Sequence, residues 1–350
     1  MQRFSRNTSA LNLIWVVLGI ILLTGCSDDT NRRSLSLAYT DSPIELNEIQ
    51  ADFAKDVDYG ESTENTFDIY LPDSIEPTPL VIYIHGGGFT GGDKSAAHES
   101  RAEDIRTFLE QGVAYATINY RLLSQEPIDE EGVLKSLTDS ARALQFIRYY
   151  ADFLNIDPQK VVLYGSSAGA GTSLWLGTHD DLADPVSTDP VLRQSTRVNA
   201  VGALATQATY DILSWEAFLL PLFEPFEEFL GGTDIPTVAA TIGEEDYLLS
   251  FLGISSLDEL ETPEVEAYLA NVDMLDLMDE EDAPIYVHNY SVDLLGNMLN
   301  AFLHHGLHAQ AVKDQADEVG LDCVAYIDDP AYLLEDPSGE ELVDFLLRHL

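Results

Sequence analysis

The sequence predicts an α/β fold with a mostly parallel, doubly wound sheet, and three observations support this prediction. Short, nearly unbroken apolar runs rich in β-branched residues recur along the chain, as in parallel strands covered on both faces. Helical patterns separate these runs, which favours strand and helix alternating around one sheet. Hydrophobic residues make up 45% of the 350 positions, which is enough for a substantial core and argues against extensive disorder.

The predicted elements follow one another along the chain. Strands are predicted at 66–71, 80–85, 113–119, 160–164, 198–205, 285–289 and 321–327. Helices are predicted at 102–112, 137–153, 168–178, 308–319 and 339–350. Residues 211 to about 280 interrupt the alternation, because they are helical, aromatic and acidic and hold no predicted strand. This insertion either walls a ligand pocket or packs as ordinary amphipathic helices.

The first 25 residues predict an export signal. Arg3 and Arg6 precede an apolar run at 11–23 that is too short for a transmembrane helix. The run ends in LTGC at 23–26, which resembles a bacterial lipobox and predicts a lipidated Cys26; an ordinary signal peptide with a chance cysteine is the alternative. We therefore expect an exported protein, lipid-anchored in the cell envelope on the periplasmic or outer-membrane face. Residues 26–45 form the predicted tether and 46–350 the folded domain.

The charge of the chain argues against a nucleic-acid partner, and its cysteine content argues against an intramolecular disulfide. The chain carries 17 Lys and Arg against 61 Asp and Glu, a net charge of -44. A nucleic-acid partner is excluded, because such binding depends on basic side chains that neutralise phosphates. Cys26 and Cys323 are the two cysteines, so acylation of the first leaves no intramolecular disulfide. Cys323 lies in a predicted strand and is expected to be a buried structural thiol.

A pentapeptide after the strand at 160–164 predicts a nucleophile. Residues 165–169 read GSSAG and lead into a helix, which fits G-x-S-x-G at a strand-to-helix turn with Ser167 as the exposed serine. Ser166 is in the wrong register. The N-terminus of the following helix favours a nearby oxyanion, because its N–H groups are unpaired.

A second motif follows the strand at 80–85. Its sequence HGGGF, at 85–89, lets backbone N–H groups approach a ligand without a Cβ in the way. Gly87 and Gly88 are predicted to supply two oxyanion donors, and Ala168 the third. Residues 86–91 also satisfy G-x-G-x-x-G, but the acidic residue that a dinucleotide site needs after the next strand is missing.

Residues 85–89, 118–122, 139–148 and 165–169 resemble the hormone-sensitive-lipase and carboxylesterase branch of the α/β-hydrolases, including acetyl-esterase-like and feruloyl-esterase-like members. The resemblance covers roughly residues 55–180. It implies an α/β-hydrolase fold with a helical cap inserted after the sixth strand. It also implies cofactor-free, metal-free hydrolysis of small carboxylic esters through an acyl-enzyme.

The acid and the base are harder to assign. In this family the order is serine, acid, histidine, and Asp293 follows the strand at 285–289 where the acid is expected. No histidine follows the strand at 321–327 except His349, at the far end of the last helix.

Three earlier histidines offer an alternative base. His304 and His305 precede the helix predicted at 308–319, and His308 opens it. This helix should begin at the catalytic edge, because the next strand runs toward that edge. We predict His305 or His308 as the base, with His305 freer to point inward. Exposed histidines without a catalytic role are the alternative. Their spacing lacks the carboxylate partner of a convincing metal site.

The sequence thus predicts a serine hydrolase for short or medium acyl esters, with Ser167 as nucleophile and Asp293 orienting the base. Two other functions stay open. One is an impaired pseudo-hydrolase that acts as a binding module, and the other is a serine peptidase on the same fold.

Overall fold

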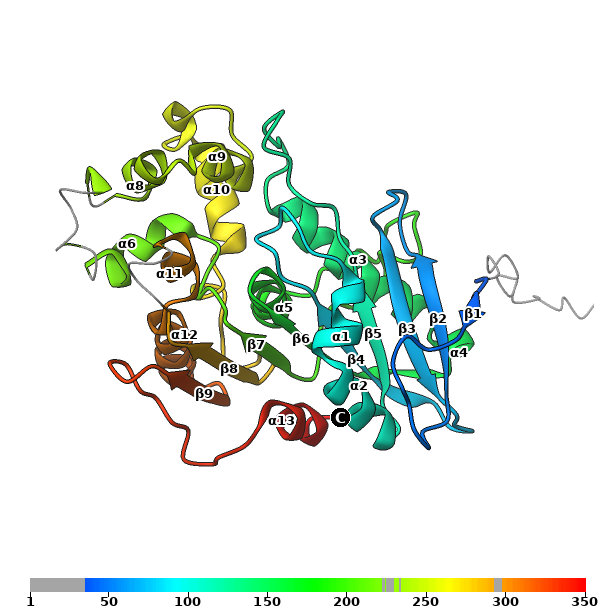
Figure 1. Cartoon of the computed structure of the whole chain (residues 1–350). Coiled ribbons are helices and arrows are strands. Elements are labelled where there is room, and N and C mark those ends of the chain that lie inside the picture. The colour runs from blue at the N-terminus through cyan, green and yellow to red at the C-terminus, as the bar shows by residue number, and fades with distance from the viewer. Residues whose placement is uncertain (1–34, 222–223, 225–229, 233, 293–297) are drawn as a thin grey trace, which may run out of the picture. The chain divides into compact units, whose positions relative to one another are not determined.

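The computed structural model describes residues 35–221, 224, 230–232, 234–292 and 298–350, and one compact unit spans Ser36–Leu350. Within the described residues, nine strands form one sheet in the order β1-β2-β3-β5-β4-β6-β7-β8-β9 (Figure 1). The strands are β1 Tyr39–Thr40, β2 Ala51–Asp58, β3 Thr66–Pro72, β4 Thr78–Ile84, β5 Ala114–Ile118, β6 Ile156–Ser166, β7 Val201–Leu204, β8 Ile285–Tyr290 and β9 Cys323–Asp328. All seven predicted strands are confirmed.

The sheet is antiparallel at one end and parallel from β5 onward. β1, β2 and β3 pair antiparallel, as do β3 and β5. The remaining neighbours, from β5 through β4 and β6 to β9, all pair parallel. The carboxyl ends of these six strands therefore share one edge, which is where ligands bind in open α/β sheets. β1 lies inside the predicted tether at 26–45, so the sheet begins earlier in the chain than predicted.

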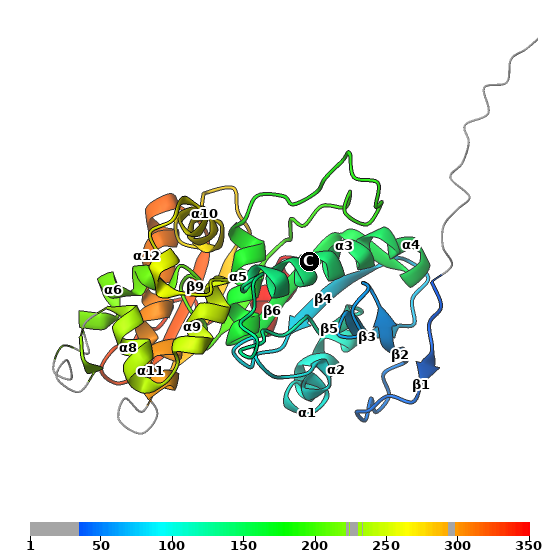
Figure 2. The same ribbon diagram turned by 90° about the horizontal axis from the view of Figure 1, so that it is seen from above.

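Helices cover both faces of the sheet (Figure 2). α3 (Leu134–Tyr149), α4 (Ala151–Leu154) and α5 (Ala168–Thr178) lie on one face, and α1 (Ala97–Ser100) and α2 (Ala102–Glu110) on the other. α12 (Gly306–Val319) packs on β8 and β9, and α13 (Leu342–Arg348) contacts α2 and β7. Every residue of α5 is buried, as expected for a helix at the centre of a layered fold.

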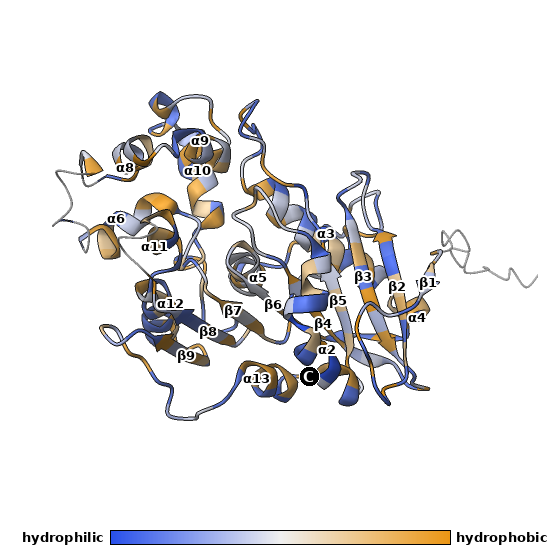
Figure 3. Ribbon diagram, in the orientation of Figure 1, coloured by the Kyte–Doolittle hydropathy of each residue, from blue (hydrophilic) through white to orange (hydrophobic). Residues whose placement is uncertain are grey.

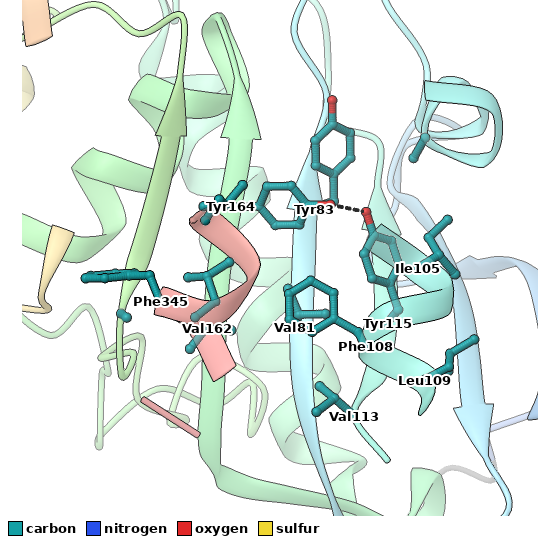
Figure 4. Packing of buried hydrophobic residues seen from close by; sticks show 14 of the residues in the cluster. Val81, Tyr83, Ile105, Phe108, Leu109, Val113, Tyr115, Val162, Tyr164 and Phe345 are labelled. Carbon is teal, nitrogen blue, oxygen red and sulfur yellow. Dashed lines mark hydrogen bonds between the residues drawn. The ribbon is translucent and has the colours of Figure 1, made fainter. Parts of the chain in front are cut away.

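The core between the sheet and α2 is aromatic (Figure 4). Tyr115 on β5 and Tyr164 on β6 are fully buried, and their hydroxyls share a hydrogen bond of 2.8 Å. Phe108 of α2 packs against both rings. Burial of each such side chain stabilises the fold by about 1.5–3 kcal/mol, and the phenolic pair satisfies the polar atoms that burial would otherwise leave unpaired.

The predicted insertion at about 211–280 follows β7, which is the sixth full-length strand if the two-residue β1 is left out. Its described residues form helices and no strand: η2 Ile212–Ser214, α6 Trp215–Phe218, α8 Ile235–Ile242, α9 Glu245–Leu252, η4 Leu257–Glu259 and α10 Pro263–Val272. Local signals set their ends. Asp234 caps α8 by accepting the Thr237 N–H, and Gly243 ends it in the left-handed conformation.

Two short helices beside the sheet edge are mostly hydrophobic, namely α6 and α11 (Met298–His304) (Figure 3). Among the described residues, no helix combines the length and the apolar character needed to cross a membrane.

Candidate active site

Ser167 occupies a strained turn between β6 and α5. Its φ of 54° and ψ of -121° are rarely adopted by residues other than glycine. The two flanking glycines are required, because a Cβ on Gly165 would lie 2.3 Å from the Gly169 carbonyl and one on Gly169 would lie 2.0 Å from the Ile84 oxygen. The Ser167 N–H donates to the Leu204 carbonyl at 2.9 Å. The turn therefore fixes the serine above the sheet edge.

The adjacent serines have different partners. Arg101 donates a hydrogen bond to the Ser166 hydroxyl at 2.8 Å. The Ser167 Oγ instead lies 2.8 Å from His304 Nε2, and Ser167 lines a cavity. The register of the motif predicted Ser167, and not Ser166, as the nucleophile. Ser167 is the serine that contacts a histidine.

His304 ends α11, and its second ring nitrogen also has a partner. Nδ1 lies 2.9 Å from Oδ1 of Asn300, one helical turn earlier. Because an amide oxygen only accepts, Nδ1 carries the proton and the lone pair of Nε2 faces Ser167. Burial lowers the pKa of His304, and an interaction with Asn300 opposes part of this shift. The imidazole is therefore neutral at pH 7, as a general base must be.

The structure does not bring His305 or His308 to Ser167, so the predicted base differs from the imidazole that lies beside the serine. His308 is buried, where Nδ1 accepts the Ala208 N–H at 3.1 Å and Nε2 donates to the Phe302 carbonyl at 2.7 Å. Burial lowers the pKa of His308 to about 3. His305 caps α12 by accepting the Leu307 N–H at 3.1 Å.

This difference has a local cause. The histidine cluster spans the break between α11, which ends at His304, and α12, which begins at Gly306. The sequence predicted a helix only from His308 onward, so the helix that carries His304 was missed. The spacing of Asn300 and His304, four residues apart between apolar positions, is the signal that could have singled out the imidazole beside Ser167.

Two predicted residues lie outside the described part of the chain. Asp293, predicted to orient the base, and Cys26, the predicted lipidation site, both fall there. Cys323 is buried as predicted, and burial raises the pKa of its thiol to about 12. No group of three or more His, Cys, Asp or Glu side chains in the described ranges could hold a metal ion.

The glycine loop after β4 lies against the nucleophile. A Cβ on Gly86 would lie 3.1 Å from that of Ser167. The loop turns at Gly87, whose φ is 122° and whose carbonyl accepts the N–H groups of Thr90 and Gly91. A Cβ on Gly87 would lie 2.2 Å from the Gly91 oxygen, so this position must be glycine. His85, at the start of the loop, stacks its ring on Tyr120.

Two of the three predicted oxyanion donors line the cavity together with Ser167. These are Gly88 and Ala168. Ala168 is the first residue of α5, and N–H groups in the first turn of a helix have no acceptor within that helix. Gly87 precedes Gly88 in the same turn.

The cavity at this edge measures about 760 Å³, including its opening. Its walls are mainly apolar and come from the glycine loop, α8, α9, α11 and the residues that follow β7: Phe89, Tyr210, Ile212, Trp215, Ile235, Val238, Ala239, Ile242, Leu248, Phe251, Leu299, Phe302 and Leu303. Gln207, Glu244 and Tyr247 add polar groups. Of the two interpretations of the insertion, the pocket wall is therefore the one that the structure supports.

Comparisons with known proteins agree with this geometry. The BD-FAE family model matches residues 67–217. Gut esterase 1 of Caenorhabditis elegans is 33% identical over 112 residues, which are 31% of this chain and 19% of that protein. A secreted lipase of Arthroderma benhamiae is 29% identical over 118 residues, 31% of this chain and 23% of the lipase. The matches thus span about a fifth of the length of these relatives.

The structural likeness extends over most of the chain. The truncated form of a carbohydrate esterase from gut microbiota superposes with a TM-score of 0.59 at 17% identity, over 87% of this chain and 98% of that one. At this identity the likeness speaks for the fold alone. The chain thus has the α/β-hydrolase fold of these esterases, and its sequence is similar to esterases and lipases over the matched segments.

Proposed function

We propose that this protein is a serine hydrolase that cleaves small carboxylic esters of short or medium acyl length through an acyl-enzyme on Ser167. One observation carries the proposal: the Ser167 Oγ lies 2.8 Å from His304 Nε2 in the wall of an apolar cavity. A nucleophile within hydrogen-bond reach of an oriented base is the arrangement that acyl transfer needs.

The first half of the reaction forms the acyl-enzyme. Ser167 Oγ attacks the ester carbonyl carbon while His304 Nε2 takes the hydroxyl proton. The carbonyl oxygen becomes an oxyanion, for which the N–H groups of Gly87, Gly88 and Ala168 are the proposed donors; removal of one such donor typically costs about 10²- to 10³-fold in kcat. Collapse of the intermediate breaks the bond to the alcohol, which leaves with the proton from His304.

The second half restores the serine. Water enters in place of the alcohol, and His304 takes one of its protons as the water oxygen attacks the acyl carbon. The acid departs when the bond to Ser167 Oγ breaks and His304 returns its proton to that oxygen. Both halves use the same base, which must therefore be neutral before each attack.

The cavity supports the proposed acyl preference. Its apolar walls favour a hydrocarbon chain, because each buried methylene contributes about 0.8 kcal/mol. The insertion closes one side, with Val238 and Ala239 of α8 and Leu248 of α9 in the wall. A peptidase would need polar partners for a peptide backbone, and the lining offers few of them.

The paired base is an argument against an impaired pseudo-hydrolase. That alternative rested on the missing histidine after the last strand, and His304 supplies the missing imidazole from another element. We also propose export and lipid anchoring through Cys26, supported by the sequence at 11–26. Replacement of Cys26 by Ser should release the protein from the membrane fraction; a variant that stays bound would contradict the anchor.

The enzymatic proposal is tested by turnover of p-nitrophenyl acetate and butyrate. Ser167→Ala should lower kcat by at least about 10⁴-fold, because no other group takes its role. Ser166→Ala is the matched control one residue away, and we expect it to keep activity within about tenfold.

The base is tested in the same assay. His304→Ala should lower kcat by about 10²- to 10⁴-fold, whereas His305→Asn, which keeps an acceptor for the cap of α12, should stay active. Equal activity of the two histidine variants would contradict the assignment of His304 as the base. No activity in the protein without substitutions would contradict the proposed function.

A further inference from the structure

We propose that Asn300 is the positioning residue for His304, so that a neutral amide takes the place in which this kind of hydrolase ordinarily holds a carboxylate. The inference rests on the proposed function. Asn300 and His304 lie four residues apart on α11, where side chains share one face of a helix. The amide Oδ1 lies 2.9 Å from Nδ1 of His304.

The hydrogen bond fixes the tautomer of the imidazole. A neutral ring has one N–H and one lone pair. Since the amide oxygen accepts at Nδ1, the proton is held there and Nε2 is left free to take the Ser167 proton. If the amide were reversed, its NH₂ group would face Nδ1 and select the other tautomer, which cannot act as base. The function of the site therefore depends on which amide atom faces the ring.

Side chains from the described part of the chain hold the end of α11. The Phe302 carbonyl accepts from His308 Nε2 at 2.7 Å, and the Leu303 carbonyl accepts from Gln207 Nε2 at 2.7 Å. Asn289 Nδ2 donates to the carbonyls of His304 and His305, at 3.3 and 3.1 Å. These bonds satisfy carbonyls that a helix end leaves open.

One of these side chains, Asn289, links the end of α11 to the sheet. Asn289 is fully buried in β8, and its Oδ1 accepts the Thr206 N–H at 2.9 Å just after β7. His308, rejected as the base, has a structural role here. The His304 carbonyl is thus tied to the sheet that carries Ser167, and the bond from Asn300 restrains rotation of the ring.

An amide and a carboxylate make different electrostatic predictions. A carboxylate at Nδ1 stabilises the imidazolium and raises the pKa of the histidine. An amide has no net charge, so burial dominates and the pKa of His304 lies below its usual value. Asn300→Asp should therefore move the acid limb of kcat/KM to higher pH while the ring keeps its orientation.

The experiment compares four variants of the full chain with p-nitrophenyl butyrate. Asn300→Leu should lower kcat by about 10²-fold or more, with KM changed by less than about threefold, because orientation matters mainly in the transition state. Asn300→Asp should restore kcat to within about tenfold of the unchanged protein and shift the acid limb upward. Asn271→Leu, an exposed asparagine on α10, is the matched control and should leave kcat unchanged.

Asp293→Asn tests the carboxylate predicted from the sequence. Under the present proposal it lowers kcat by less than Asn300→Leu does. A larger loss in Asp293→Asn would overturn the proposal, and so would full activity of Asn300→Leu. A rise in kcat of about 10²-fold in Asn300→Asp would also overturn it, because the amide would then face the ring with its NH₂ group. Circular dichroism separates misfolding of Asn300→Leu from a true loss, and a failure of the proposed function would appear instead as an inactive unchanged protein.

Discussion

His304 lies in surroundings that favour its uncharged form. The ring is partly buried beside an apolar cavity, and burial lowers its pKa from the ordinary value of 6.5. A general base is active only when unprotonated, so a lowered pKa keeps the site competent in mildly acidic solution. The lowered pKa of His304 therefore depends on the neighbours of this one side chain.

The pH dependence of kcat/KM should show an acid limb with its midpoint below pH 6.5. The pKa of His304 is lowered, so the base is lost only when the pH falls through that lower value. Initial rates from pH 4 to 8 with a neutral ester measure it, and His305→Asn should give the same limb. A midpoint above 6.5 would mean that a negative charge outweighs burial at the ring.

The nucleophile and the base differ in how far the sequence could predict them. Ser167 sits in a local motif in which two glycines are required by close approach of the backbone, and such requirements are visible in the sequence. His304 depends on where one helix ends and the next begins. The helix end is held by contacts from residues distant in the chain, among them Gln207 and Asn289, and the local sequence does not show these contacts.

At the scale of elements, the insertion turns an open sheet edge into a pocket. Its helices α8 and α9 pack beside each other and bring apolar residues over Ser167. Ala239 lines the cavity, whereas the next residue of α8, Ala240, is exposed. These neighbouring alanines allow the wall to be changed with a matched control.

Ala239→Trp should shorten the acyl chain that the protein accepts. A ring at this position would take the space of several methylenes, each contributing about 0.8 kcal/mol or fourfold. The kcat/KM for an octanoate ester should therefore fall by about 10²-fold relative to acetate. Ala240→Trp should leave the ratio unchanged, and an unchanged ratio in both variants would mean that the acyl chain lies elsewhere.

The parallel strands could be predicted better than the strands at the sheet's first edge. Residues 80–84 of β4, 161–164 of β6 and β7 as a whole are short runs without charged residues, which the sequence displays directly. β2 was missed because its pairing with β3 shifts register between Ala54 and Val57. The shift places Phe53, Ala54 and Val57 in the interior, so the strict alternation that marks a half-buried strand is lost.

At the scale of the whole molecule, the parallel sheet explains why distant motifs meet. The glycine loop follows β4 and the serine turn follows β6, and these strands are neighbours although they are far apart in the chain. α11 follows β8 and reaches the same edge. One sheet edge thus gathers the glycine loop, Ser167, His304 and the pocket, which is why the fold predicted the location of the candidate site.

The most direct test of the account is covalent labelling of the full chain with a fluorophosphonate probe, followed by mass spectrometry of the labelled peptide. An activated serine attacks the phosphorus and displaces fluoride, so we expect one adduct, on Ser167. The adduct should form much more slowly in His304→Ala and at the normal rate in His305→Asn. An adduct on Ser166, or no adduct on a folded and soluble protein, would contradict the claim that Ser167 is a nucleophile activated by His304.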